Sequence, residues 1–373
     1  MADAAQTYEA GQHPELPPPR TEVGVRGWVK HNLLSSPLNA VMTVLAIWFL
    51  WLLIPPLFDW FVLDAVWTAD SRRDCWDKME VPEGAACWAF IKGRIQLFIY
   101  GFYPQASRWR VNLSLVLLIM AIAPVLYDKM PGRKYWLCYA MAFPFIAGWL
   151  LVGGIGLTPV DTDQFGGIML SLVIGVTGIS FSLPIGILLA LGRRSSMPVL
   201  RLLCVLFIEF IRGVPLIALL FIASSMLNFF LPPGTSFDLL LRVLIMVTLF
   251  ASAYIAEVVR GGLQAIPRGQ HEAADSLGLT YAKAQMLIIL PQALKISIPG
   301  IVNTFIGLFK DTTLVLIIGM LDPLGIGKAA LADAAWSGLS REVYLFVALF
   351  FFVCCFSMSR YSLYLERKLH TGH

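Results

Sequence analysis

The chain alternates between long apolar runs and short polar segments. An α-helix of about 20 apolar residues, rising about 1.5 Å per residue, crosses the hydrocarbon core of a bilayer. Apolar runs of that length recur along most of the sequence and predict an all-α polytopic membrane protein. We expect about eight transmembrane helices, at roughly 38–58, 110–127, 135–153, 168–191, 201–230, 239–261, 296–320 and 343–362.

Composition and charge agree with this class and orient the chain. The 373 residues are 58% hydrophobic and 14% charged, which is too apolar for a soluble domain of this length. Lys and Arg concentrate in cytoplasmic loops of membrane proteins, so both termini are expected in the cytoplasm. The net charge of +4 therefore indicates topology, and no nucleic-acid partner is expected. The clusters that set this orientation are Arg20, Arg26 and Lys30; Lys129, Arg133 and Lys134; Arg193 and Arg194; and Arg367 and Lys368.

A stretch rich in Gly, Pro and Asp near residue 160 divides the chain. We expect a cytoplasmic N-terminal tail at 1–35, an accessory three-helix region at 36–160, and a functional core at 161–373, where nearly every predicted span carries a charge. The accessory region contains an extracytoplasmic loop at 59–108, which holds Cys75 and Cys87. These two cysteines face an oxidising compartment, where they are free to pair, but their spacing alone does not decide it.

The segment 262–292 lies between two predicted spans and is too polar to cross the membrane. It contains HEAADSL, a run of good helix formers, and we expect two short helices joined at Gly278. A compact helical projection of this kind suits docking into another protein. An ordinary interfacial loop is the alternative.

Several classes of chemistry are missing from the sequence. No G-x-x-x-x-G-K-[ST] motif is present, so the chain has no ATPase site of that type. All five histidines lie outside the predicted spans, which argues against haem ligation or an intramembrane proton relay. No hydrolase or metal-site motif occurs either. We expect a chain that is not an enzyme and that binds no metal or cofactor.

Charged residues within the spans are the first candidates for function. Glu209 and Arg212 are three residues apart, as are Glu257 and Arg260, so each pair can neutralise itself on one helical face. In the alternative, these charge pairs have no function in the mechanism and only hold two helices together. The Arg212-Gly213-Val214-Pro215 sequence is expected to break or kink its helix, because Pro215 cannot continue the backbone hydrogen bonding.

The sequence FIGLFKDTTLVLI places Lys310 and Asp311 deep in the seventh span. Adjacent residues point about 100° apart on a helix, so each charge needs its own partner or a wet cavity. Thr304, Gly307 and Asp311 share one face with Asn303 beside it, so this stripe is a candidate pocket wall in which Asp311 supplies an anion for a cationic group of a ligand. Lys310 is expected to pair with another helix or subunit. In the alternative, both charges only hold helices or subunits together.

Four motifs together resemble the polar amino acid uptake branch of the ABC importer permeases. They are EFIRGVPLIALL (209–220), SAYIAEVVRGGLQAIPRGQHEAA (252–274), EAADSLG with IILPQAL, and PQALKISIPGIVNTFIGLFKDTTLVLIIGM (291–320). The resemblance implies that the last five helices form a type I permease core. It also implies an ATPase coupling site at Glu272, Ala273, Ala274, Asp275, Leu277 and Gly278, and it adds Pro215 and Leu216 to the pocket candidates. The N-terminal extension resembles the AapM-type subunit of general L-amino acid transporters.

The same resemblance implies the assembly and its location. Expected partners are a second homologous permease, two nucleotide-binding ATPase subunits that hold ATP and Mg²⁺, a periplasmic amino acid-binding protein, the L-amino acid substrate and membrane lipid. The location is the bacterial inner membrane. An ion-coupled secondary transporter, with Asp311 or Glu209 titrating, is the alternative, and a membrane enzyme or scaffold is a third. The identity of the amino acids, and the subunit that holds the pocket, stay open.

Overall fold

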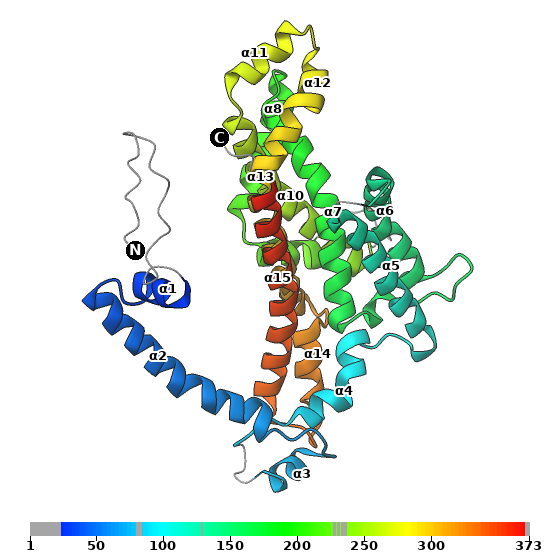
Figure 1. Ribbon diagram of the computed structural model, residues 1–373. Coiled ribbons are helices and arrows are strands. Elements are labelled where there is room, and N and C mark those ends of the chain that lie inside the picture. The colour runs from blue at the N-terminus through cyan, green and yellow to red at the C-terminus, as the bar shows by residue number, and fades with distance from the viewer. Residues whose placement is uncertain are drawn as a thin grey trace, which may run out of the picture. The chain divides into compact units, whose positions relative to one another are not determined.

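The structure is a computed structural model that describes residues 24–79, 84–127, 130–226, 229, 232 and 237–369. Throughout these ranges the regular secondary structure is helical, as predicted (Figure 1). Arg20 and Lys129, which helped to orient the chain, lie outside the described residues. The chain divides into two compact units, and the first contains the residues up to Val66 together with Trp76–Ala86.

The first unit holds the first predicted span. Helix α1 (Gly24–Asn32) precedes α2 (Pro37–Phe58), which continues as a π-helical turn, η1 (Asp59–Leu63). Ser36 caps α2, since its side chain accepts a hydrogen bond from the backbone N–H of Asn39 at 3.1 Å. The apolar run 37–63 is long enough to cross a membrane, which agrees with the predicted span at 38–58.

The second unit begins with residues that were predicted as a loop. Helix α3 (Arg72–Asp77) lies at the boundary of the two units, and α4 (Trp88–Tyr100) follows. The loop prediction is therefore too simple, because α4 is a regular helix that buries an apolar face including Phe90 and Phe98. It packs against α7, α14 and α15. The next elements are η2 (Gln105–Ser107), α5 (Arg108–Leu126) and α6 (Arg133–Val152).

The remaining helices form the predicted core. They are η3 (Thr162–Gln164), α7 (Gly167–Arg193), α8 (Pro198–Gly213), α9 (Leu216–Phe221), η4 (Ile222–Met226), α10 (Leu239–Ala265), α11 (Arg268–Ser276), α12 (Tyr281–Ala284), η6 (Gln285–Ile289), α13 (Leu290–Asp311), η7 (Thr312–Ile318), α14 (Pro323–Ala330) and α15 (Ser340–Leu369). Among the described residues, seven helices are long and apolar enough to span a membrane, and an eighth span results if α8 and α9–η4 are counted together.

The fifth predicted span, 201–230, is bent rather than straight. Helix α8 and the segment Leu216–Met226 meet at 102°. Val214 is extended, with φ −110° and ψ 132°, because the residue before a proline is disfavoured in the α region. Pro215 has no N–H to continue the helix. The predicted break at Arg212-Gly213-Val214-Pro215 is thus present, whereas its angle was not predictable from the sequence.

Helix α10 lies at the centre of the core and contacts α7, α8 and α13. Two glycines allow this close packing. A Cβ atom at Gly186 of α7 would lie 2.6 Å from the Ile255 side chain, and one at Gly262 of α10 would lie 2.5 Å from the carbonyl oxygen of Ala293. Helices α5 and α6 pack on α7 through a cluster that includes Leu118, Phe143 and Val176. The second unit therefore continues across residue 160, where the sequence suggested a division.

Candidate functional site

The segment predicted to couple to an ATPase forms a short helix that projects between two membrane spans. Helix α11 begins after Pro267 and ends at Ser276, and Gly278 follows with φ of +67°. The N–H of Gly278 donates to the carbonyl of Asp275 at 2.9 Å, and the N–H of Leu279 donates to that of Ala274 at 3.2 Å. This is the glycine-ended helix terminus that the sequence predicts at Gly278.

One face of α11 is exposed and the other is buried. Glu272, Ala273, Asp275, Leu277 and Gly278 are all exposed. Leu277 has 74% of its surface accessible, so its apolar side chain is available for contact with a partner. Ala274 is fully buried and faces the chain's own interior. The surface available to a partner therefore contains five of the six predicted coupling residues, and Ala274 anchors the helix beneath them.

The second short helix expected after Gly278 is not a separate element. Helix α12 continues without a break through η6 into α13, and the apolar helix runs over Tyr281–Ile318. Pro291 does not interrupt this helix, because it lies in the first turn of α13, where a missing N–H costs little. The correction matters because the exposed segment leads directly into the helix that carries Asp311.

A side-chain hydrogen bond ties α11 to α13. The Nε2 group of Gln292 donates to Oε1 of Gln270 at 3.0 Å and to the carbonyl oxygen of Ile288 at 3.0 Å. Neither glutamine was singled out from the sequence, because two amides 22 residues apart carry no recognisable motif. The pair gives the exposed helix a direct contact with the membrane-spanning one.

The charges of α7, α8 and α10 form one cluster around Glu257. Oε1 of Glu257 accepts from Arg193 at 2.7 Å, and Oε2 lies 2.7 Å from Arg260 and 3.5 Å from Arg212. Arg193 also reaches Glu209 at 2.9 Å. The Glu257 side chain is only 14% exposed, so its charge is largely shielded from water. Three helices are therefore held together through one carboxylate.

The pairing differs in part from the prediction. Glu257 and Arg260 pair as the three-residue spacing predicts. Glu209 pairs with Arg193, and no ion pair joins Glu209 to Arg212 within the part of the chain that the structure describes. The prediction of two self-neutralising pairs is half correct, because a partner on a neighbouring helix replaces one on the same helix. Arg193 had been noted only as a marker of topology.

The predicted pocket wall lies along the second half of α13. The Thr304 hydroxyl donates to the carbonyl oxygen of Gly300 at 2.9 Å, so its lone pairs stay available. A Cβ atom built at Gly307 meets nothing within 4 Å, which shows open space beside the helix there. Asn303 is exposed on the neighbouring face. Space and polar groups therefore occur together on this stretch.

Asp311 is the last residue of α13 and is half-buried. Within the described ranges it has no hydrogen-bond or ion-pair partner among protein side chains, and Lys310 is exposed and forms no ion pair there. The expected acidic partner of Lys310 is thus absent from the described part of this chain. Asp311 remains a carboxylate with unfilled hydrogen-bonding capacity.

The bend of the fifth span lies close to the end of α13 that carries Asp311. Helix α9 contacts η7, the 3₁₀ segment that follows Asp311. Pro215 is exposed, whereas Leu216 is buried in the cluster that also contains Leu308 and Val315. Leu216 therefore packs the core behind the predicted pocket, and only Pro215 of this pair is accessible.

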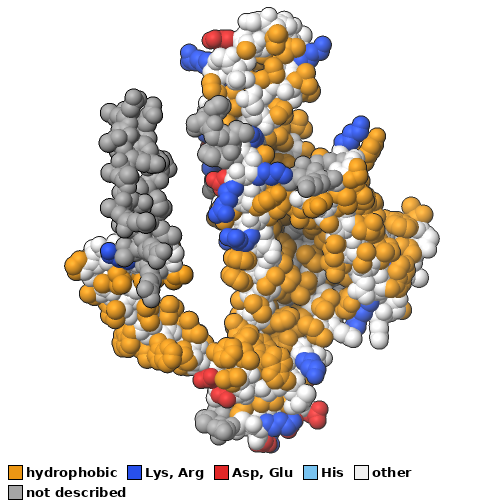
Figure 2. Space-filling model, viewed as in Figure 1, with side chains coloured by type: hydrophobic (Ala, Val, Ile, Leu, Met, Phe, Trp, Pro, Cys, Tyr) orange, Lys and Arg blue, Asp and Glu red, His pale blue; other side chains and the backbone are white. Residues whose placement is uncertain are grey.

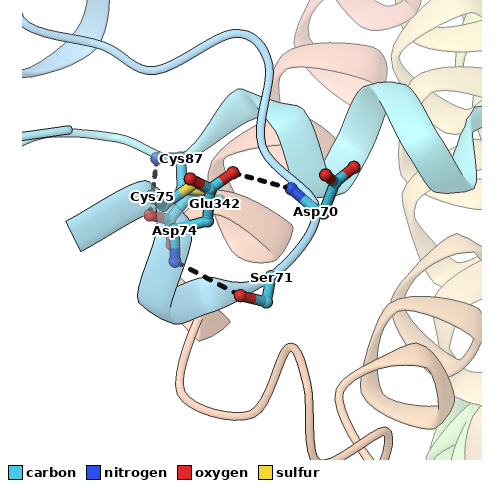
Figure 3. The surroundings of a disulfide bond; sticks show 6 residues. All are labelled: Asp70, Ser71, Asp74, Cys75, Cys87 and Glu342. Atoms are coloured by element: carbon cyan, nitrogen blue, oxygen red, sulfur yellow. Dashed lines mark hydrogen bonds between the residues drawn. A yellow bond between two sulfur atoms is a disulfide. The ribbon is translucent and has the colours of Figure 1, made fainter. Parts of the chain in front are cut away.

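The two cysteines of the loop form a disulfide. Cys75 and Cys87 are joined, with their Cα atoms 6.0 Å apart (Figure 3). The Cys87 N–H donates to Oε1 of the buried Glu342 at 3.1 Å, which links the disulfide to the first turn of α15. Arg94 binds Asp333 at 2.5 Å, and the Phe90 and Trp336 rings lie 5.6 Å apart. The disulfide-bearing segment is thus fastened to the connection between α14 and α15.

Asp322 is a fully buried acid that sequence reasoning missed. It precedes α14, and its Oδ1 accepts from the Gly325 N–H at 2.8 Å. Its Oδ2 has no hydrogen-bond partner among the described residues. Burial raises the pKa of Asp322 to about 6, against the smaller opposing effects of the backbone N–H groups of Gly325 and Leu324 and the charge of Lys328. The only available signal was an N-cap Asp before a proline.

No group of three or more potential metal-ligating side chains occurs among residues 24–79, 84–127, 130–226 and 237–369. The candidate site that the described residues offer is made of the exposed short helix α11, the charge cluster around Glu257 and the polar face of α13. None of these groups is arranged as a hydrolytic or redox centre.

Comparisons with a protein family and with individual proteins both match this chain to the same class of membrane protein. Residues 182–371 match the family described as binding-protein-dependent transport system inner membrane component. The inner membrane amino-acid ABC transporter permease protein YhdY of Escherichia coli K12 is 51% identical over 362 residues, covering 96% of this chain and 97% of that protein. The glutamate/glutamine/aspartate/asparagine transport system permease protein BztC of Rhodobacter capsulatus is 47% identical over 425 residues, covering 96% of both.

A chain in the crystal structure of an amino acid ABC transporter with histidines is 30% identical, with a TM-score of 0.49. The matched region covers 54% of the present chain and 92% of the chain in that crystal structure. The narrower expectation of an AapM-type subunit stays a prediction.

Proposed function

The chain belongs to the family of binding-protein-dependent transport system inner membrane components, and on this premise we propose that it is the permease subunit of an ATP-driven importer of L-amino acids. The substrate class is supported by the names of two relatives that match almost the whole chain, one an amino-acid permease and the other a permease for acidic amino acids and their amides. The direction of transport is from the periplasm to the cytoplasm.

One observation carries the coupling part of the proposal. An exposed helix, α11, is joined to a membrane-spanning helix both through the chain and through the hydrogen bond between Gln270 and Gln292. ATPase subunits that bind the exposed face of α11 would move α13 directly. Rigid elements with such contacts are the means by which a domain motion reaches a distant site.

The proposed importer would contain several subunits besides this chain. A second homologous permease would complete the membrane pathway, and two ATPase subunits would hold ATP and Mg²⁺. A periplasmic amino acid-binding protein would deliver the substrate. This chain would bind no cofactor and catalyse no reaction itself, because the ATPase subunits would hold and hydrolyse the nucleotide.

The proposed pocket lies on α13. Asp311 would bind the substrate ammonium, and the open space beside Gly307 would admit the ligand. Thr304 and Asn303 would supply polar contacts, and Pro215, which precedes the helix α9 that contacts η7, would supply an apolar one. A carboxylate without a protein partner favours this role over a purely structural one, since a structural charge would be expected to have its partner in place.

The proposed orientation places both termini in the cytoplasm of a bacterial cell. The disulfide supports this orientation, because Cys75 and Cys87 would then face the oxidising periplasm. Helix α11 would lie on the opposite, cytoplasmic side, where ATP is available.

The test is uptake of radiolabelled amino acids by proteoliposomes that contain the full complex, with ionophores present to abolish ion gradients. We expect uptake that requires ATP and the binding protein. Uptake driven by a proton or sodium gradient in vesicles that contain this chain without an ATPase would contradict the proposal.

A further inference from the structure

A crevice of about 490 Å³ lies between the α5–α6 hairpin and helices α7 and α10. Its walls are apolar, and they include Leu115 of α5, Gly148 of α6, Val176 of α7 and Ile245 of α10. A Cβ atom built at Gly148 meets nothing within 4 Å, so the space beside this glycine is unfilled. The polar side chains that line the crevice are Asn112, Ser114, Thr177 and Thr248.

The crevice lies within the membrane-spanning part of all four helices. Leu115, Phe145, Leu241 and Ile245 line it and are also exposed, so the crevice opens sideways at the molecular surface. Figure 2 shows that hydrophobic side chains cover the side of the molecule that carries α5 and α6. Hydrocarbon is the solvent at this depth, and a dry apolar volume that opens to hydrocarbon takes up a chain rather than water.

A cation stands at one end of the crevice. Arg108, Asn112 and Leu115 follow one face of α5, with Arg108 one turn beyond Asn112. The Arg108 guanidinium lies 5.1 Å from the Tyr100 ring centre, and the Tyr100 hydroxyl donates to Oδ1 of Asn112 at 2.8 Å. Side-chain contacts therefore run from Arg108 through Tyr100 to Asn112, which lines the crevice.

The charge of Arg108 is not neutralised by an acid within the described ranges. Its side chain donates to Oε1 of Gln96 at 2.7 Å and to the carbonyl oxygen of Tyr103 at 3.4 Å, and both acceptors are neutral. Arg108 is half-buried at the end of a membrane span, which is the level of the lipid headgroups. A guanidinium in this position is suited to bind a phosphodiester.

We propose that this crevice is a binding site for one phospholipid of the leaflet on the disulfide side of the membrane. One acyl chain occupies the space between α5–α6 and α7–α10 and passes Gly148, and the headgroup phosphate binds Arg108. The lipid fills the space that the protein's own side chains leave between the hairpin and the core, so it forms part of the contact between them. This site is independent of the transport function proposed above.

Photocrosslinking of the full-length chain in nanodiscs tests the proposal. The probe is phosphatidylglycerol with a diazirine on one acyl chain, in a phosphatidylethanolamine background, and a diacylglycerol with the same diazirine serves as the probe without phosphate. We expect crosslinks to the phosphatidylglycerol probe to concentrate in residues 111–118, 143–152, 168–185 and 240–249. Gly148→Trp should remove most of this labelling, because the indole would occupy part of the crevice, in which a Cβ atom built at Gly148 meets nothing within 4 Å.

Matched variants separate this site from ordinary lipid contact. Ile119→Trp adds the same side chain to an exposed position of α5 that does not line the crevice, and it should leave the labelling unchanged. Arg108→Gln should lower labelling by phosphatidylglycerol about fivefold and leave diacylglycerol labelling unaffected. The proposal would be overturned if the probe labelled all exposed helices equally and if Gly148→Trp left this labelling unchanged.

Discussion

Gln292 of α13 donates a hydrogen bond of 3.0 Å to Gln270 of α11. The contact joins the helix that is exposed for a partner to the helix that carries the proposed pocket. Any force applied to α11 therefore reaches α13 through a side chain as well as through the intervening backbone.

We predict that Gln292→Ala lowers ATP-driven uptake several-fold while the ATPase subunits still bind. A hydrogen bond of this type contributes about 1 kcal/mol, which corresponds to about a fivefold change in an equilibrium. The measurement is uptake per ATP hydrolysed in proteoliposomes. Gln270→Ala should have a similar effect, and the double variant should add little. Additive losses in the double variant would show that the two residues act separately.

Glu257 holds three arginines, so its loss should be far more damaging than the loss of Glu209. We predict that Glu257→Gln destabilises the folded protein by about 1.5–3 kcal/mol, because Arg193, Arg212 and Arg260, which are only partly exposed, lose their shared carboxylate. Glu209→Gln is the control, since that side chain is 57% exposed, and it should cost no more than about 1 kcal/mol. Thermal unfolding in detergent measures both. Equal midpoints for the two variants would contradict the central role of Glu257.

Asp322 should make the stability of the protein depend on pH. Its pKa is about 6 in the folded state and about 3.9 when unfolded, so the folded state holds the proton more tightly. The resulting stabilisation, about 3 kcal/mol, is present below pH 4 and is lost as the pH rises to about 6. We predict that Asp322→Asn unfolds at a higher temperature than the wild type at pH 8 and at a similar one at pH 4.

The amide keeps the oxygen that caps α14, whereas Asp322→Ala removes it and should be destabilised by about 1 kcal/mol at both pH values. An Asp322→Asn variant with the same pH dependence as the wild type would show that another group is responsible.

Asp311→Asn should weaken substrate binding without unfolding the protein. A hydrogen bond to a charged group contributes about 1.5–3 kcal/mol, so the KM for uptake should rise about 10- to 100-fold. Lys310→Gln is the control and should change the KM little, because that side chain is exposed. If Asp311→Asn instead lowers the unfolding temperature and leaves the KM unchanged, Asp311 has a structural role.

The length of the apolar runs was enough to predict the membrane spans, since crossing a bilayer depends on little else. The break at Pro215 was also predictable, because a proline cannot continue a hydrogen-bonded helix. Its 102° angle was not, since that angle depends on what the two halves pack against. Helix α4 escaped prediction because WAFIKGRIQLFIY mixes charged residues with an apolar face that only tertiary contacts bury.

The site was predicted less completely than the fold. Spacing along one helix identified the Glu257–Arg260 pair, but it assigned Glu209 to the wrong arginine. Arg193 lies on a different helix, and no local pattern reports such a neighbour. Gln270 and Gln292 were missed for the same reason. Gly278 was predictable because a positive φ at a helix end is a local requirement that glycine meets.

The central claim is that α11 transmits ATP hydrolysis to amino acid movement. Its most direct test is substrate-stimulated ATPase activity and uptake, recorded on the same proteoliposomes, for the wild type, Glu272→Lys and Gly278→Asp. The matched control is Gly269→Ala, a change within α11 at a position where an added Cβ meets nothing within 4 Å. We predict that Glu272→Lys and Gly278→Asp lose both activities and ATPase binding, while Gly269→Ala keeps all three. Full uptake and ATPase binding in Glu272→Lys and Gly278→Asp would contradict the claim.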